Sequence, residues 1–153
     1  MYIRRKVKVM NFTDQVHQLI AESLSEARSV IQEGGTWDPL VHIVHPQGVE
    51  SMFVLGLHAS SNEKSKLVNE INNQMGALKG IWMITVGDVW IWEDTPDGSV
   101  AISWEIPFSG RRKALLIQVV ARCERSIGGI QKYTRSADGQ VLFGEFHWGD
   151  PLA

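Results

Sequence analysis

The sequence predicts an α+β domain whose sheet is mostly antiparallel, and three observations support this class. Apolar residues recur at helical spacing in two segments, one on each side of a short β-rich stretch. The long stretch 81–148 alternates as strands do and holds five of the six tryptophans. The dipeptides Asp97-Gly98, Gly128-Gly129 and Asp138-Gly139 divide it, and such pairs supply the positive φ angles of two-residue hairpin turns. We expect a hairpin and a C-terminal meander, with two helices packed on one face of the sheet.

Length and composition define the broad class. The 153 residues suit a single domain, 1–153, that buries its own core. With 44% hydrophobic and 21% charged residues the chain is of globular type. A net charge of −2 provides no broad field for nucleic acid, and the apolar runs are too short to cross a membrane. The single cysteine, Cys123, cannot form an internal disulfide, which favours a cytoplasmic location.

The start of the chain allows two interpretations. Residues 2–10 alternate between apolar and basic side chains. Such a pattern is typical of a basic edge strand, in which lysines discourage pairing with other chains. A flexible basic tail would have the same composition. Residues 1–10 are therefore expected to form either a basic edge strand or a flexible tail.

The first helix is predicted from Phe12 to Ile31. Asn11 is a suitable N-cap, and Asp14 lies near the positive end of the helix dipole. Gly34-Gly35 is expected to end the helix.

A hairpin and a second helix follow. The strands 39–44 and 49–57 are joined by His45-Pro46-Gln47-Gly48, which has turn chemistry. Ser60 and Glu63 form a capping box at the start of the second helix. Gly80 is expected to end that helix, and its apolar face is predicted to contain Leu67, Val68, Ile71, Met75 and Leu78.

The C-terminal meander is predicted to contain five strands. The first, 81–92, places Trp82, Trp90 and Trp92 on one side and is interrupted by a bulge at Gly87-Asp88. The second, 100–108, places Trp104 inward. The others are 114–121, which is apolar on both faces, 130–135 and 140–148.

The predicted sheet has more apolar surface than the predicted helices can cover. Five strands make a layer about 24 Å wide, and two helices side by side cover most of one face. The strands 81–92 and 114–121 are nevertheless apolar on both sides. The second face could be covered by curling of the sheet, by a second copy of the chain, or by a ligand or protein partner. We favour the second copy, a homodimer.

No catalytic, metal or cofactor motif outweighs its ordinary structural interpretation. His42 and His45 lie three apart on a strand and so point to opposite faces, which argues against a shared metal ion. The glycine-rich stretch 126–130 precedes a strand and lacks the helix N-terminus of a phosphate loop. Gly-x-Ser-x-Gly is absent. The basic loop Arg111-Arg112-Lys113 is explained by solvation in a turn. The sequence therefore leans against an enzyme and implies no cofactor.

One polar cluster is a candidate binding site. If Gly128-Gly129 were a two-residue turn, Glu124 would pair with Tyr133 and Arg122 with Arg135 on one face of the sheet. Two arginines directly opposite each other repel unless a negative group lies between them. Glu124 can serve as that group, or a small anionic ligand can. A solvent-exposed ion pair is the simpler interpretation.

Two hypotheses about function remain. The first is a small non-catalytic binding or assembly module that self-associates through an apolar sheet face and can bind another protein. The second is a small-molecule-binding protein or enzyme with a tryptophan-lined cavity and a charged rim. Its residues would be Trp82, Trp90, Trp92 and Trp104 in the cavity and Arg122, Glu124 and Arg135 at the rim.

Overall fold

The computed structural model of the chain describes residues 14–54, 61–92, 101–103, 112–121 and 126–149. The elements in chain order are α2 (Asp14–Gln32), β1 (Leu40–His45), β2 (Gly48–Phe53), α3 (Ser61–Ala77), β3 (Trp82–Trp92), β4 (Ala101–Ser103), β5 (Arg112–Ala121), β6 (Ser126–Arg135) and β7 (Val141–Trp148). The predicted edge strand or tail at residues 1–10, the Asn11 and Ser60 caps and the Asp97-Gly98 turn lie outside the described residues.

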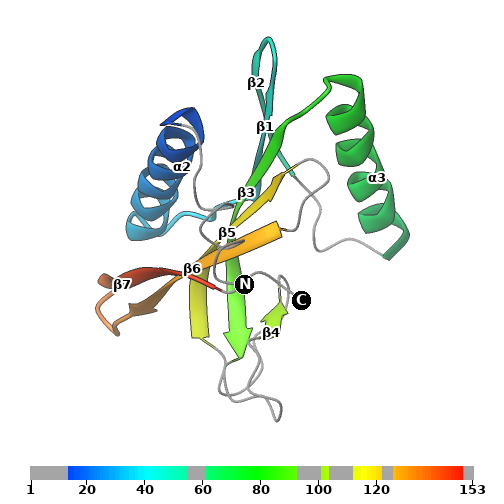
Figure 1. Cartoon of the computed structure of the whole chain (residues 1–153). Helices are drawn as coiled ribbons and strands as arrows, with labels where there is room; N and C mark the ends of the chain where they lie inside the picture. The colour runs from blue at the N-terminus through cyan, green and yellow to red at the C-terminus, as the bar shows by residue number, and fades with distance from the viewer. Residues whose placement is uncertain (1–13, 55–60, 93–100, 104–111, 122–125, 150–153) are drawn as a thin grey trace.

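The strands form one sheet in the order β2-β1-β3-β5-β6-β7, and β4 pairs with the far end of β3 (Figure 1). Every pairing is antiparallel. This arrangement confirms the α+β class with a mostly antiparallel sheet. The N-terminal hairpin is also confirmed, as strands β1 and β2.

The centre of the sheet is the β3–β5 ladder. It runs in one unbroken register from Trp82 opposite Ala121 to Ile91 opposite Arg112. The predicted bulge at Gly87-Asp88 is therefore wrong, because Gly87 and Asp88 pair in register with β5. Alternation along β3 consequently continues, and Asp88 lies on the same face as Trp82 and Trp90.

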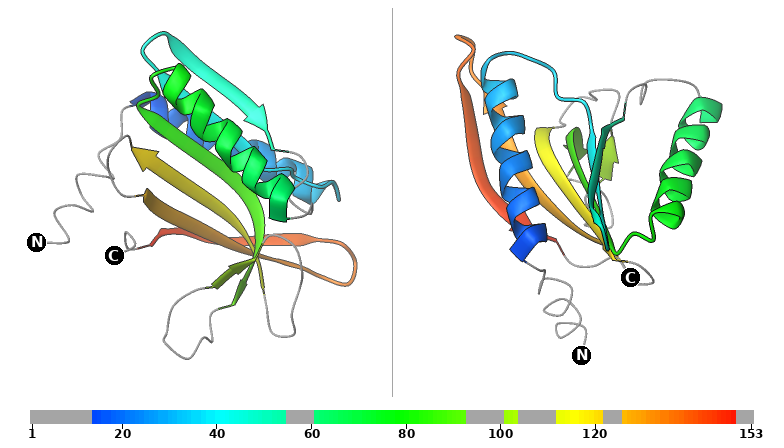
Figure 2. Two further views of the ribbon diagram at one scale, coloured as in Figure 1. Left: turned by 90° about the vertical axis from the view of Figure 1, so that its right-hand side faces the viewer. Right: turned by 90° about the horizontal axis from the view of Figure 1, so that it is seen from above.

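The two helices lie on opposite faces of the sheet, so the prediction that both pack on one face is wrong. The apolar side of α2 packs with Leu40, Val44 and Ile84. The apolar side of α3 packs with Val41 and Ile43. Neighbouring positions on a strand point to opposite faces, so these two sets belong to different faces of the sheet. Figures 1 and 2 show the sheet between the two helices.

The sheet curls around α2. The core cluster that contains the buried face of α2 also includes residues of β1, β3, β5 and β6. Half-buried side chains from β7 complete it, namely Val141, Phe143, Phe146 and Trp148. The view from above shows β7 and the β1–β2 hairpin on opposite sides of α2 (Figure 2, right). This curvature lets a single helix fill most of one face.

The other face is buried as well. Val89, Ile91, Ala114 and Leu116 form a second cluster, with exposed fractions of 0 to 3%, and Ile130 packs against it. These side chains belong to the surface that the sequence assigned to a second copy of the chain. They are already shielded within one chain, so their burial does not require a dimer.

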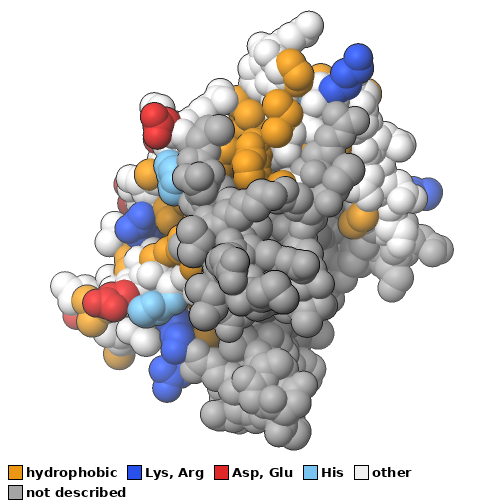
Figure 3. All heavy atoms as spheres, viewed as in Figure 1, with side chains coloured by type: hydrophobic (Ala, Val, Ile, Leu, Met, Phe, Trp, Pro, Cys, Tyr) orange, Lys and Arg blue, Asp and Glu red, His pale blue; other side chains and the backbone are white. Residues whose placement is uncertain are grey.

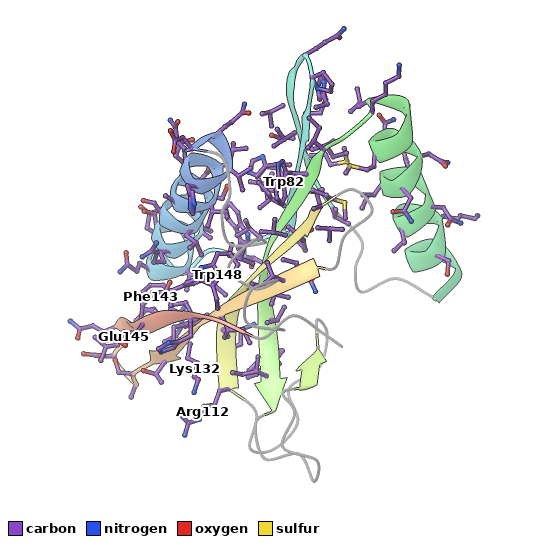
Figure 4. All side chains as sticks on the ribbon, viewed as in Figure 1. Trp82, Arg112, Lys132, Phe143, Glu145 and Trp148 are labelled. Carbon is purple, nitrogen blue, oxygen red and sulfur yellow. The ribbon has the colours of Figure 1, made fainter. Side chains whose placement is uncertain are left out.

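Some apolar surface remains near the start of β3. Trp82 is half-buried against the α2 core, and Ile81 is 45% exposed. Apolar side chains gather between α2 and α3 in Figure 3, in the area where Figure 4 labels Trp82.

Gly128 and Gly129 are not a turn, because both lie inside β6, opposite Gln118 and Ile117. The physical reason is packing. A Cβ on Gly129 would meet the rings of Phe146 and Trp148, so glycine is used here for close approach and not for a positive φ angle. A turn does form at Asp138-Gly139, but not the predicted two-residue one: of the pair only Gly139 has a positive φ angle, +87°, and its N–H donates to the Ser136 carbonyl, so the loop contains residues 137–139.

The helix ends are partly as predicted. Gly34 adopts φ +82° at the end of α2, and the N–H of Gly35 donates to the Val30 carbonyl, as expected for a glycine C-cap.

At the end of α3, Lys79 and not Gly80 has the positive φ angle, 54°. Gly80 is instead packed closely against Met75 and Ile43. Val68, predicted on the apolar face of α3, is 56% exposed.

The β6–β7 ladder contains a register shift between Gln131 and Tyr133. Lys132 therefore lies opposite both Gly144 and Glu145 at this bulge (Figure 4). Neither described helix combines the length and apolar content needed to cross a bilayer.

The two neighbouring glycines of β6 give a direct test of this register. We expect Gly129→Ala to lower the free energy of unfolding by about 1–3 kcal/mol, because the new methyl group displaces the Phe146 ring. Gly128→Ala is the matched control: its Cβ would approach only the Ile117 carbonyl oxygen, at 3.7 Å. Urea unfolding of both variants measures the difference. Equal losses at the two positions, as a turn would give, would contradict the register.

Candidate functional site

A buried histidine links the first helix to the N-terminal hairpin. His42 on β1 is 7% exposed, and both of its ring nitrogens are hydrogen bonded. Nε2 lies 2.7 Å from the hydroxyl of Ser23, which is buried on α2. Nδ1 lies 2.6 Å from the hydroxyl of Ser51 on β2. We call this chain of groups the His42 relay (Ser23, His42 and Ser51).

The surroundings of His42 keep the ring neutral. Desolvation by burial lowers the pKa of His42 below its ordinary value, and the carboxylates of Glu26 and Glu22 on α2 oppose this effect. A neutral imidazole has one donor and one acceptor nitrogen, and a serine hydroxyl can play either part. Both polar ends of the buried ring are therefore satisfied without a charge.

The outer border of the sheet next to this relay is strand β2. It is the last strand in the sheet order, and no described strand pairs with its outer side (Figure 2, left). Residues of an antiparallel strand alternate between bonding inward and outward. Val54 donates its N–H to the Pro39 carbonyl, so Gly48, Glu50 and Met52 also bond inward to β1.

The remaining backbone groups of β2 therefore point away from the sheet. They belong to Val49, Ser51 and Phe53, which we call the β2 edge. No hydrogen bond to these outward groups exists within the described ranges of the chain. Phe53 is also 53% exposed, although its ring packs edge-on against that of Trp37, with the ring centroids 5.7 Å apart.

The β2 edge has few of the features that usually protect an edge strand, since Glu50 is the one charged residue of β2. The sequence Gly-Val-Glu-Ser-Met-Phe contains no lysine, arginine or proline, and the β1–β2 register has no bulge. The opposite border of the sheet, β7, does contain a bulge. Of the two borders, β2 is therefore the one suited to pair with another strand.

A second polar group lies on the α2 side of β3, β5 and β6. Asp88 accepts a hydrogen bond from the Tyr133 hydroxyl at 2.8 Å and forms an ion pair with Lys113 Nζ at 3.1 Å. The same Nζ lies 4.6 Å from the centre of the Trp90 ring. We call Asp88, Trp90, Lys113 and Tyr133 the Asp88 cluster.

The Asp88 cluster has its charges paired internally. Burial raises the pKa of the Tyr133 hydroxyl, and the neighbouring Asp88 carboxylate raises it further. Tyr133 therefore stays protonated and donates to Asp88, while Lys113 balances the charge of the carboxylate. The cluster is complete in itself, and nothing in its described contacts calls for a ligand.

The predicted polar cluster is not formed in the predicted way. Tyr133 pairs with Lys113 and not with Glu124, because the Gly128-Gly129 turn on which that register depended is wrong. Arg135 donates to the Ile31 carbonyl at 3.0 Å and so ties β6 to the last turn of α2. Arg122 and Glu124 lie outside the described residues.

The tryptophan-lined cavity stays a prediction. Trp90 lies beneath Lys113 in the Asp88 cluster. Trp92 pairs with Ala101 at the end of β3, and Trp104 lies outside the described residues. Trp82 lies on the same face of β3 as Trp90, but eight residue pairs away along the ladder.

The His42 relay was missed by the sequence analysis. A lone histidine within an apolar strand does carry a signal, since a buried polar ring needs partners. The sequence gives no means of identifying Ser23 and Ser51 as those partners, because they come from other elements. Among the described residues no three His, Cys, Asp or Glu side chains are grouped to bind a metal ion.

The chain was compared with protein-family models, curated proteins and solved structures, and none of them matches.

The His42 relay predicts a pH dependence of stability. The unfolded chain binds a proton at this histidine with a pKa of about 6.5, whereas burial lowers the pKa of His42 in the folded chain. Below that pH the unfolded state binds more protons, so stability falls on acidification. We expect His42→Gln to unfold with a weaker pH dependence between about pH 7.5 and 5.5, by at most about 1.4 kcal/mol per pH unit.

Urea unfolding of the wild-type chain and the variant at both pH values is the measurement. The other four histidines are common to both proteins and cancel in the comparison. An identical pH dependence in the two proteins would show that His42 is not held neutral.

Proposed function

We propose that this chain is a non-catalytic assembly module that self-associates by adding a strand at the β2 edge. The observation that supports it is the row of outward backbone groups on Val49, Ser51 and Phe53, which have no partner within the described ranges. An unprotected edge strand is a template for pairing with another chain. The exposed Phe53 ring adds apolar surface beside that template.

This proposal keeps the self-association expected from the sequence but moves it to another surface. The apolar sheet faces are filled within one chain, by α2 on one side and by the clusters around Val41 and Val89 on the other. An interface formed by the edge needs no opening of that core. We propose that the module acts in the cytoplasm, where its single cysteine would remain reduced.

Strand addition also agrees with the chemistry of the remaining groups. The Asp88 cluster pairs its own charges, and the His42 relay satisfies both ring nitrogens. Neither arrangement provides an exposed nucleophile beside a base and an oxyanion site, which acyl transfer requires. The backbone of the β2 edge is a described surface whose hydrogen-bonding capacity stays unused, and unlike the border at β7 it is not interrupted by a bulge.

The proposal predicts that a charge at the edge weakens association. We expect Phe53→Lys to weaken self-association by at least tenfold, or about 1.4 kcal/mol, because an edge lysine opposes strand pairing. Leu142→Lys is the matched control, since Leu142 is 68% exposed on β7, at the other border. Sedimentation over a range of protein concentrations measures both, with thermal melting to confirm folding.

Two outcomes would contradict the proposal. The first is a wild-type chain that sediments as a 17.2 kDa monomer at the highest concentration. The second is an association that Leu142→Lys weakens as strongly as Phe53→Lys does.

A further inference from the structure

We infer that the partner at the β2 edge is the same edge of a second copy, in an antiparallel register centred on Ser51. This inference rests on the proposed function and specifies its geometry. Two β2 strands related by a two-fold axis run antiparallel, and such an axis makes the same patch bind itself. The question is which register the strand can adopt.

Hydrogen bonding selects one register. In an antiparallel ladder, residues that bond outward must lie opposite residues that also bond outward. Placing Ser51 opposite its own copy also sets Val49 opposite Phe53 of the second copy, and Phe53 opposite Val49. All three outward residues of the β2 edge are then bonded. A shift of two residues towards the hairpin turn would set Phe53 opposite Gln47, beyond the end of β2, and the opposite shift would set Val49 opposite residue 55, outside the described residues.

Side chains favour the same register. Glu50 is the one charged residue of β2. In the Ser51-centred register it lies opposite Met52 of the second copy. In the register shifted by two residues towards the hairpin turn, Glu50 would lie opposite its own copy, and like charges directly opposite are unfavourable.

The apolar contacts agree as well. Val49, Ser51 and Phe53 point to the α2 side of the sheet, where Val49 packs against the core and Ser51 bonds to His42. The exposed Phe53 ring would lie beside Val49 of the second copy, an aromatic and β-branched pair of the kind that stabilises sheets. Ser51, at the axis, is small enough to meet itself.

The same geometry implies a closed dimer. If β2 paired instead with β7 of another copy, a dimer would keep one open border on each chain and would grow into a larger ring or a filament. The bulge between Gln131 and Tyr133 disturbs the border that such growth would need. Pairing of β2 with β2 uses the unprotected border of both copies, and the assembly stops at two.

Single cysteines test the register. In a Cys123→Ala background, Ser51→Cys should form a disulfide-linked dimer on mild oxidation. Its two Cα atoms would lie about 5.5 Å apart, within the range that disulfides span. Val49→Cys and Phe53→Cys should not cross-link alone, because each cysteine would lie about 13 Å along the strand from its copy. An equimolar mixture of the two should cross-link.

Glu50→Cys is the register control, because it cross-links with itself only in the shifted register. Efficient cross-linking of Glu50→Cys, or failure of the Ser51→Cys protein to cross-link under conditions where it associates, would overturn the inference. If association persists and Phe53→Lys still abolishes it, the proposed function stands and the register alone is wrong. A wild-type monomer would instead remove the proposed function itself.

Discussion

The structure depends on the β3–β5 ladder, whose side chains are buried on both faces over most of its length. Ile84 and Val86 face α2, while Val89 and Ile91 face the other way, and each is at most 1% exposed. A strand pair that is apolar on both sides must be covered twice, at a gain of about 25 cal/mol for each Å² removed from water. This requirement separates the two helices, one to each face, and makes the sheet curl around α2. Once both faces are filled, the backbone groups of the described sheet that stay unpaired lie at its borders.

The polar groups near this core each connect different elements. The His42 relay joins α2 to β1 and β2, and Arg135 joins β6 to the last turn of α2. Trp37 donates its indole N–H to the Val86 carbonyl and fixes the connection after α2 to the central strand. Gln131 also connects two elements, since its Nε2 donates to the Gly144 carbonyl on β7 at the bulge. Its Oε1 atom differs from the other polar atoms named here, because it is buried with no hydrogen-bond partner in the described structure. Of these contacts, the His42 relay ties the β1–β2 hairpin to α2 and so holds β2 in place at the border of the sheet.

The sequence predicts what depends on local pattern. The span of α2, its glycine ending, the β1–β2 hairpin and the presence of a turn at Asp138-Gly139 all follow from spacing and turn chemistry, and each is confirmed. Gly128-Gly129 was misassigned because a glycine pair serves equally well for a turn and for close approach, and only the positions of Phe146 and Trp148 decide between them. Because Gly128 and Gly129 lie inside β6 and not in a turn, the residues of β6 pair with other positions than predicted. Tyr133 therefore lies opposite Lys113, and its expected pairing with Glu124 is wrong. The helix placement failed for a related reason: apolar spacing shows that a helix has a buried side but not which face of the sheet it covers.

In this structure the faces of the sheet are largely closed, whereas the β2 edge is open to a partner strand. Residue-resolved amide hydrogen exchange at low and high protein concentration tests this arrangement most directly. The inward amides of Glu50 and Met52 should be protected at both concentrations, as should those of β3 and β5. The amides of Val49, Ser51 and Phe53 should exchange rapidly in dilute solution and become protected as the chains associate. Uniform protection along β2 at low concentration, or exchange at Val49, Ser51 and Phe53 that does not change with concentration, would contradict the account.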